Sequence, residues 1–167
     1  MHMDISYNDG LSGRFDSGGV MKTDNKPTFT VLVDDNFHFM DEDERWTAGT
    51  YDSLREALER CLQMVGQDLL QGHRATMAAA DLYESYTMMG DDPFIQGPMK
   101  TMFSAWNYAQ ELATFLAGRT EGAAPAAEEP FRAAWLADFL ALEKSVPANK
   151  ATRMLDVVLE FGEEEAE

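Results

Sequence analysis

The alternation of Phe29, Val31 and Val33 with Thr30, Leu32 and Asp34 places the strongest constraint on how this chain can fold. A period of two with β-branched residues predicts a strand with one apolar face. Residues 45–51 predict a second strand after an acidic connection, and Gly49 marks a bulge or a close backbone approach. The two strands define an antiparallel ribbon whose apolar face needs a cover.

The segment after this ribbon predicts the helix that covers it. Ser53 is followed three residues later by Glu56, which is the capping-box pattern of a helix N-terminus. Apolar residues then recur at helical spacing, and Gly72 is expected to end the helix in the left-handed conformation. The apolar stripe consists of Leu54, Ala57, Leu58, Cys61, Leu62, Val65 and Leu69.

The next segments alternate helix, turn and strand signals. A second helix is expected to begin with Thr76 as its cap and to end at Gly90, with Met89 on its apolar face. Residues 91–93 predict a turn, because Pro93 biases the residue before it away from helix. Residues 94–96 predict a short third strand that pairs with an edge of the ribbon.

The remainder predicts a third helix from Met99 to Gly118 and then two more. Residues 119–130 are rich in Ala, Glu, Gly and Pro, which is typical of a flexible linker. Pro130 and Pro147 each suit the first turn of a helix. These elements predict an α+β fold: a small antiparallel sheet of two or three strands, helices packed on one face, and a C-terminal helical pair. The expected organisation is a disordered tail over 1–27, a core domain over 28–118, the linker over 119–130, the helical pair over 131–162 and an acidic tail over 163–167.

Charge limits the classes of partner. The net charge is −17, from 30 acidic and 13 basic residues, so phosphate backbones and anionic membranes would repel the chain. The sequence contains no apolar run of the roughly 18–20 residues that cross a bilayer and no signal-peptide pattern. Its one cysteine, Cys61, forms no internal disulfide. We therefore expect a cytoplasmic protein that binds neither nucleic acid nor membrane.

The end of the first strand holds the best candidate site for a ligand or a metal. Carboxylate, amide and imidazole groups follow one another there and offer ligands to a hard divalent cation. The spacing does not match a calcium-binding loop, because Phe39 stands where that loop requires glycine. Trp46, Asp91 and Asp92 are expected at the rim of any pocket. The candidate ligands are Asp34, Asp35, Asn36 and His38.

No catalytic or cofactor motif accompanies this site. His38 could act as a general base oriented by Asp34 or Asp35, but no nucleophile elbow is present. The glycine-rich loops that bind dinucleotides or nucleoside triphosphates are also absent from the sequence. Cys61 lies on an apolar stripe, which indicates a core thiol, and His73 is expected at the surface. The sequence favours a protein without catalysis and without a cofactor.

Two functional hypotheses follow from these observations. The first is a small acidic interaction or accessory protein, working through an acidic surface or through a methionine-rich and aromatic one, with a protein partner or as a homodimer through its C-terminal helices. The abundant methionines and aromatics are most simply assigned to the core, and an adaptable binding groove is the alternative. They are Met88, Met89, Met99, Met102, Trp106 and Trp135. The second hypothesis is a small-molecule or divalent-metal-binding protein, with hydrolysis as an option, centred on Asp34, Asp35 and His38.

Several segments occur in an order that resembles a known protein family. VDDNFHFMDEDERWTAGTY, LYESYTMMGDDPFI and FSAWNYAQELA resemble the DDNFH, ERY-x-x-G-x-[FY], GEDPFI and FSAWDYA segments of small bacterial proteins of unknown function. The resemblance covers residues 28–118. It implies a bacterial, cytoplasmic protein, and it implies no activity, cofactor or catalytic residue.

Overall fold

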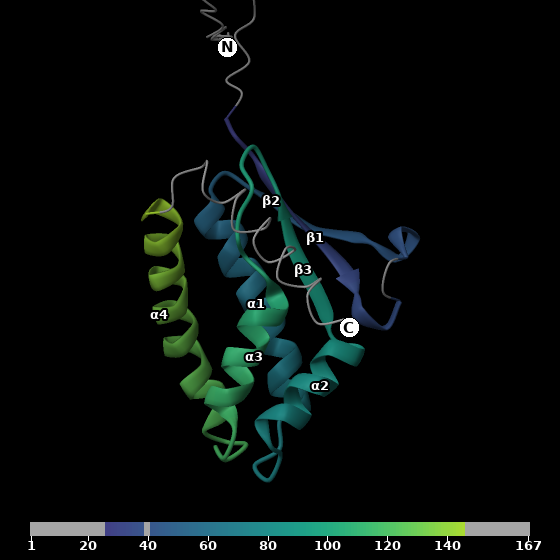
Figure 1. Cartoon of the computed structure of the whole chain (residues 1–167), viewed down its shortest axis with the longest axis vertical. Helices are drawn as coiled ribbons and strands as arrows, with labels where there is room; N and C mark the ends of the chain where they lie inside the picture. The colour runs from purple at the N-terminus through teal and green to yellow at the C-terminus, as the bar shows by residue number, and fades with distance from the viewer. Residues whose placement is uncertain (1–25, 39–40, 146–167) are drawn as a thin grey trace, which may run out of the picture.

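The computed structural model describes residues 26–38 and 41–145 and confirms the α+β class (Figure 1). Three antiparallel strands form one sheet in the order β2-β1-β3, so β1 is central. The strands are β1 (Phe29–Asp35), β2 (Trp46–Tyr51) and β3 (Asp91–Gln96), with the 3₁₀ turns η1 (Asn36–His38) and η2 (Glu42–Glu44) between the first two. The helices in this part of the chain are α1 (Leu54–Gly72), α2 (Ala79–Met89), α3 (Ala105–Leu116) and α4 (Ala124–Ser145).

The predicted ribbon is present, with the predicted irregularity in it. Val31 of β1 lies opposite Gly49, but the next residue, Leu32, lies opposite Thr47, so β2 contains a bulge at this point. A side chain at Gly49 would start only 2.7 Å from the hydroxyl oxygen of Tyr51. Gly49 therefore lies at the bulge that the sequence predicted, and its close neighbour is the Tyr51 side chain rather than another backbone segment.

The first helix covers the sheet, as its apolar stripe predicts. Phe29, Val31 and Val33 are buried in one cluster with Ala57 and Cys61 of α1. Other residues of the α1 stripe face the neighbouring helices and belong to a second, larger cluster. Burying each Val or Leu of this kind stabilises the fold by roughly 1.5–3 kcal/mol. The α1 residues in the second cluster are Leu58, Leu62, Val65 and Leu69.

The larger cluster is formed mainly by helices. Tyr108 and Leu112 of α3 are fully buried in it, and Leu136 of α4 contributes to the same core. Figure 1 shows α4 at the left, on the side of α3 and α1 away from the sheet. Glu128 of α4 comes so close to α1 that a side-chain carbon at Gly66 would lie 2.6 Å from its carboxylate oxygen. Because α4 shares this core, it is part of the same packed unit as residues 28–118.

Two predicted boundaries in the middle of the chain are wrong. Residues 91–93 form the start of β3 rather than a turn. A proline is tolerated there because β3 is an edge strand, and one side of an edge strand has no neighbouring strand to accept a backbone N–H. The predicted strand at 94–96 is the second half of β3 and pairs with β1. The second helix begins at Ala79 without a side-chain cap, so Thr76 is not its N-cap.

The later helices also differ from the prediction. The third helix begins at Ala105, with Ser104 as its cap, rather than at Met99. Residues 124–130, assigned to a linker, are helical, and Pro130 lies inside α4 instead of at its start. Gly72 is the last residue of α1, but it does not adopt the predicted left-handed conformation. Gly118, just after α3, does adopt it, with a φ of 77°. The second helix of the predicted C-terminal pair, the acidic tail and residues 1–25 of the predicted N-terminal tail lie outside the described residues.

The cap of α1 gives a first testable prediction. Ser53 Oγ accepts a hydrogen bond from the Glu56 N–H at 3.2 Å and donates one to its carboxylate at 3.0 Å. Ser53→Ala is expected to lower the free energy of unfolding by about 1 kcal/mol, because a backbone N–H loses its acceptor. Urea denaturation measures this loss. Ser53→Asp retains an acceptor and should stay within a few tenths of a kcal/mol of the parent, so an equal loss in both variants would contradict the capping role.

Candidate functional site

The four predicted ligands at the end of β1 are separated by the structure. Asp34 accepts two hydrogen bonds from Arg45, at 2.6 Å from Nε and 3.1 Å from Nη2. The Arg45 guanidinium also lies 5.0 Å from the centre of the Phe94 ring. Asp34 is therefore engaged in a bidentate ion pair that connects β1 to the residue before β2.

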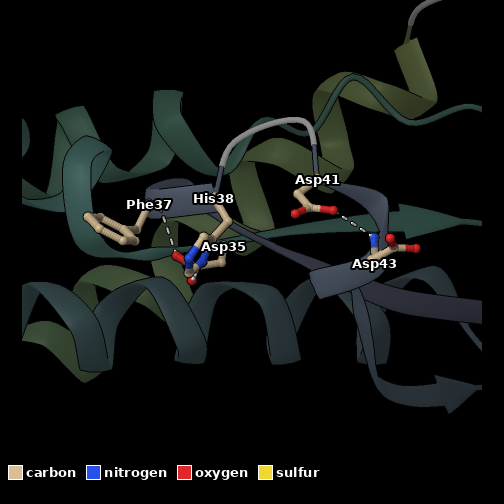
Figure 2. A network of polar contacts seen from close by, with 5 residues as sticks. All are labelled: Asp35, Phe37, His38, Asp41 and Asp43. Atoms are coloured by element: carbon tan, nitrogen blue, oxygen red, sulfur yellow. Dashed lines mark hydrogen bonds and ion pairs between the residues drawn. The ribbon is translucent and has the colours of Figure 1, made fainter.

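Asp35 and His38 form a second, separate pair (Figure 2). His38 Nδ1 lies 2.8 Å from Asp35 Oδ2, and Asp35 Oδ1 accepts a hydrogen bond from the Phe37 N–H. This hydrogen bond between the two side chains lowers the pKa of Asp35 and raises the pKa of His38. Both groups are largely in solvent, so the pair fixes the shape of η1 more than it stabilises the fold.

Asn36 points inward and anchors η1. Its amide nitrogen donates to the Tyr86 carbonyl at 3.2 Å, and its amide oxygen accepts from the Trp106 indole N–H at 3.2 Å. Its backbone N–H donates to the Gly90 carbonyl at 3.1 Å. These bonds hold the turn against the end of α2, so Asn36 serves as a buried structural tie rather than as part of an open ligand set.

Two of the three predicted rim residues lie beside the predicted ligands, and the third does not. Asp91 and Asp92 lie opposite Asp35 and Asp34 in the sheet, while Trp46 lies on the other side of β1, opposite Val33. Within residues 26–38 and 41–145 there is no group of three or more His, Cys, Asp or Glu side chains that could hold a metal ion.

Three carboxylates near this end of the sheet form no ion pair with any other described residue. Burial raises the pKa of Asp68, Asp91 and Asp92. For Asp92 the pKa reaches about 6, with burial as the larger cause and the Asp34 charge as the smaller one. Asp68, on α1, accepts a hydrogen bond from the Asp91 N–H at 2.8 Å. The area therefore carries negative charge that the described cations do not compensate.

An exposed apolar surface lies beside these carboxylates. We define the η1–α2 surface as Phe37, Met88 and Met89, whose exposed fractions are 64 %, 59 % and 65 %. The hydrogen bonds of Asn36 bring η1 against the end of α2, where both methionines lie. The assignment of Met88 and Met89 to the core is therefore wrong. The sequence signal that could have indicated their exposure is the position of two consecutive methionines directly before the glycine that ends α2.

A cavity of about 250 Å³ opens between α1 and α2 next to this surface. Asp68 and Leu69 line it from α1, and Leu82, Tyr86 and Met89 line it from α2. Met89 belongs to both the cavity wall and the η1–α2 surface. None of the seven predicted site residues lines this cavity or a second, open hollow of about 640 Å³ between α3 and α4.

Two residues with reactive side chains have structural roles. Cys61 is fully buried, as predicted, and burial raises the pKa of its thiol to about 12, which keeps the thiol protonated. His73 was expected at the surface but is buried, with Nε2 3.0 Å from the Leu116 carbonyl oxygen. His73 thus connects the end of α1 to the end of α3.

Another set of exposed apolar residues lies near the end of α4. Met99, Met102 and Leu142 are all exposed, so the assignment of Met99 and Met102 to the core is also wrong. Glu143 accepts a hydrogen bond from the Met102 N–H at 2.8 Å. This set adjoins the point where the described chain ends, and nothing in the structure shows what lies over it.

The fold and site define a sheet covered by helices, with an acidic and apolar region at one end. No helix in the part of the chain that the structure describes is long and apolar enough to cross a membrane. Comparison with known proteins found no matching family model, no matching curated protein and no matching solved structure. The site is therefore interpreted from its own geometry.

Proposed function

We propose that this protein is a non-enzymatic interaction protein of the cytoplasm, and that its η1–α2 surface binds a basic, partly apolar segment of a partner protein. The observation that carries the proposal is the exposure of Phe37, Met88 and Met89 side by side with carboxylates that lack ion pairs in the described chain. Large exposed apolar side chains within a polar rim are typical of protein interaction sites.

The rigidity of the surrounding backbone supports this proposal. Asn36 makes three hydrogen bonds that fix η1, and Gly90 N–H donates to the Tyr86 carbonyl at 2.7 Å to close α2. Phe37 and the two methionines therefore extend from a backbone that is already ordered, which lowers the entropic cost of binding. Methionine side chains adapt to different apolar partners, and an aromatic ring supplies a large contact area.

The charge distribution supports a basic partner. The chain has a net charge of −17, and Asp68, Asp91 and Asp92 are partly buried carboxylates near the η1–α2 surface. Lysine or arginine residues of a partner would lower the cost of these ionised groups and would accelerate association at low salt. The same charge disfavours a phosphate-bearing partner such as nucleic acid.

The alternative site for a metal or small molecule receives less support. Asp34 is paired with Arg45, Asp35 is paired with His38, and Asn36 is buried between α2 and Trp106. A ligand that used all of these groups would first have to break each of these contacts. The exposed side chains of the η1–α2 surface require no such rearrangement.

Affinity purification from the source cells tests the proposal. We expect the parent protein to retain a reproducible partner and the double variant Phe37→Ser, Met89→Ser to lose it, because the apolar contact area is removed while the charge is unchanged. Leu142→Ser is the matched control, since it removes an exposed apolar side chain at the end of α4. A partner retained by the double variant, or the absence of any reproducible partner, would contradict the proposal.

A further inference from the structure

The cavity between α1 and α2 has the dimensions of a side-chain pocket. Its volume of about 250 Å³ lies below the roughly 300–1,000 Å³ of pockets that enclose cofactors or drug-sized ligands. Met89 forms part of its wall and is also part of the η1–α2 surface. A segment bound on that surface could therefore extend one side chain into the cavity without leaving the surface.

The lining of the cavity is mostly polar, with the Asp68 carboxylate, Gln71 and Ser85, and has a smaller apolar part. Asp68 uses Oδ2 to accept the Asp91 N–H, and its other oxygen takes no hydrogen bond from the rest of the described chain. Met89 supplies exposed aliphatic surface beside it, whereas Leu69 and Leu82 lie buried behind the lining. A long cationic side chain matches both parts, because its methylene stem packs on apolar groups while its charged end requires an anion.

We infer that this cavity receives a lysine or arginine side chain of the partner segment, with Asp68 accepting its hydrogen bond and Met89 contacting its stem. The inference rests on the proposed function and names the recognition element within it. A neutral apolar side chain would occupy the cavity but would leave the partly buried carboxylate unpaired. An anionic group would be repelled by Asp68 and by the neighbouring Asp91.

Calorimetric titration with a synthetic amphipathic helical peptide of leucine, alanine and lysine tests the inference at physiological salt. We expect Asp68→Asn to weaken binding about tenfold, because a charge-assisted hydrogen bond is lost. The asparagine side chain still offers an oxygen to the Asp91 N–H, so the local fold should be kept. Glu84→Gln is the matched control: Glu84 is an exposed α2 carboxylate outside the cavity, and its loss should change the affinity less than about twofold.

A second variant and a second peptide separate the outcomes. Ser85→Trp fills the cavity without changing the charge and should weaken binding as Asp68→Asn does. With glutamine in place of lysine in the peptide, the parent and Asp68→Asn should bind equally weakly. Equal effects of Asp68→Asn and Glu84→Gln would overturn the cavity inference and leave the proposed surface standing. If the lysine peptide fails to bind the parent protein, the proposal that the partner segment is basic is overturned, and the proposed function with it.

Discussion

Val31→Asp is expected to abolish the cooperative folding transition of the chain. Val31 lies in the central strand, has no exposed surface and packs with Ala57 and Cys61 of α1. An aspartate at this position would place a carboxylate in an apolar cluster without a partner, at a cost of more than about 4 kcal/mol. That cost is comparable with the roughly 5–15 kcal/mol by which a typical domain is stable. Circular dichroism during thermal and urea denaturation measures the effect.

The control is Thr50→Asp, which introduces the same charge in the same sheet. Thr50 is exposed, and we expect its substitution to cost less than about 1 kcal/mol. Val31→Thr keeps the shape of valine but buries a hydroxyl group, and it should cost about 1–3 kcal/mol. A Val31→Asp protein that unfolds at the same urea concentration as Thr50→Asp would show that the face of β1 against α1 is not the core.

Asp92→Asn is expected to stabilise the protein in a pH-dependent manner. Burial and the Asp34 charge raise the pKa of Asp92 to about 6 in the folded chain, against 3.8 as its ordinary value. The folded state therefore binds the proton more tightly than the unfolded state, so stability falls as the pH rises from about 4 to about 6. Asparagine removes this penalty. The gain in unfolding free energy should be near zero at pH 4 and about 2 kcal/mol at pH 7.5.

Net charge requires a separate control, because any lost negative charge relieves repulsion in a chain of charge −17. Asp138→Asn removes an exposed carboxylate on α4 and measures this general effect. We expect it to change stability by less than about 0.5 kcal/mol at either pH. If Asp92→Asn gives the same gain in unfolding free energy at pH 4 and pH 7.5, or no more than Asp138→Asn gives, the ionised Asp92 does not destabilise the fold.

The parts of the fold that follow from the sequence are those with a strong local pattern. The alternation through Phe29, Val31 and Val33 and the Ser53 cap each identify an element without reference to the rest of the chain. Residues 91–93 could not be assigned in this way, because a proline is compatible with a strand only at an edge, and strand order is a tertiary property. The start of α4 was missed because an Ala- and Glu-rich segment suits a helix or a linker, and packing against Gly66 decides between them.

The polar residues at the end of β1 could be identified from the sequence, but their contacts could not. The end of β1 does carry the polar side chains, yet Asn36 is buried and Asp34 and Asp35 take partners from different segments. Asp68 could not be connected to this region from the sequence, because its contact with Asp91 joins positions 23 residues apart. The exposure of Met88 and Met89 depends on where α2 ends relative to η1, and helical spacing does not determine that.

The most direct test of the binding surface is an amide chemical-shift map of the isotope-labelled full chain, titrated with the lysine-containing peptide. We expect saturable shifts centred on Phe37, Asp68 and Met89, with Leu32 and Phe94 on the outer side of the sheet unaffected. Shifts confined to α4 or to the outer side of the sheet would contradict the account, as would a map with no saturable shift at residues 37, 68, 88 and 89.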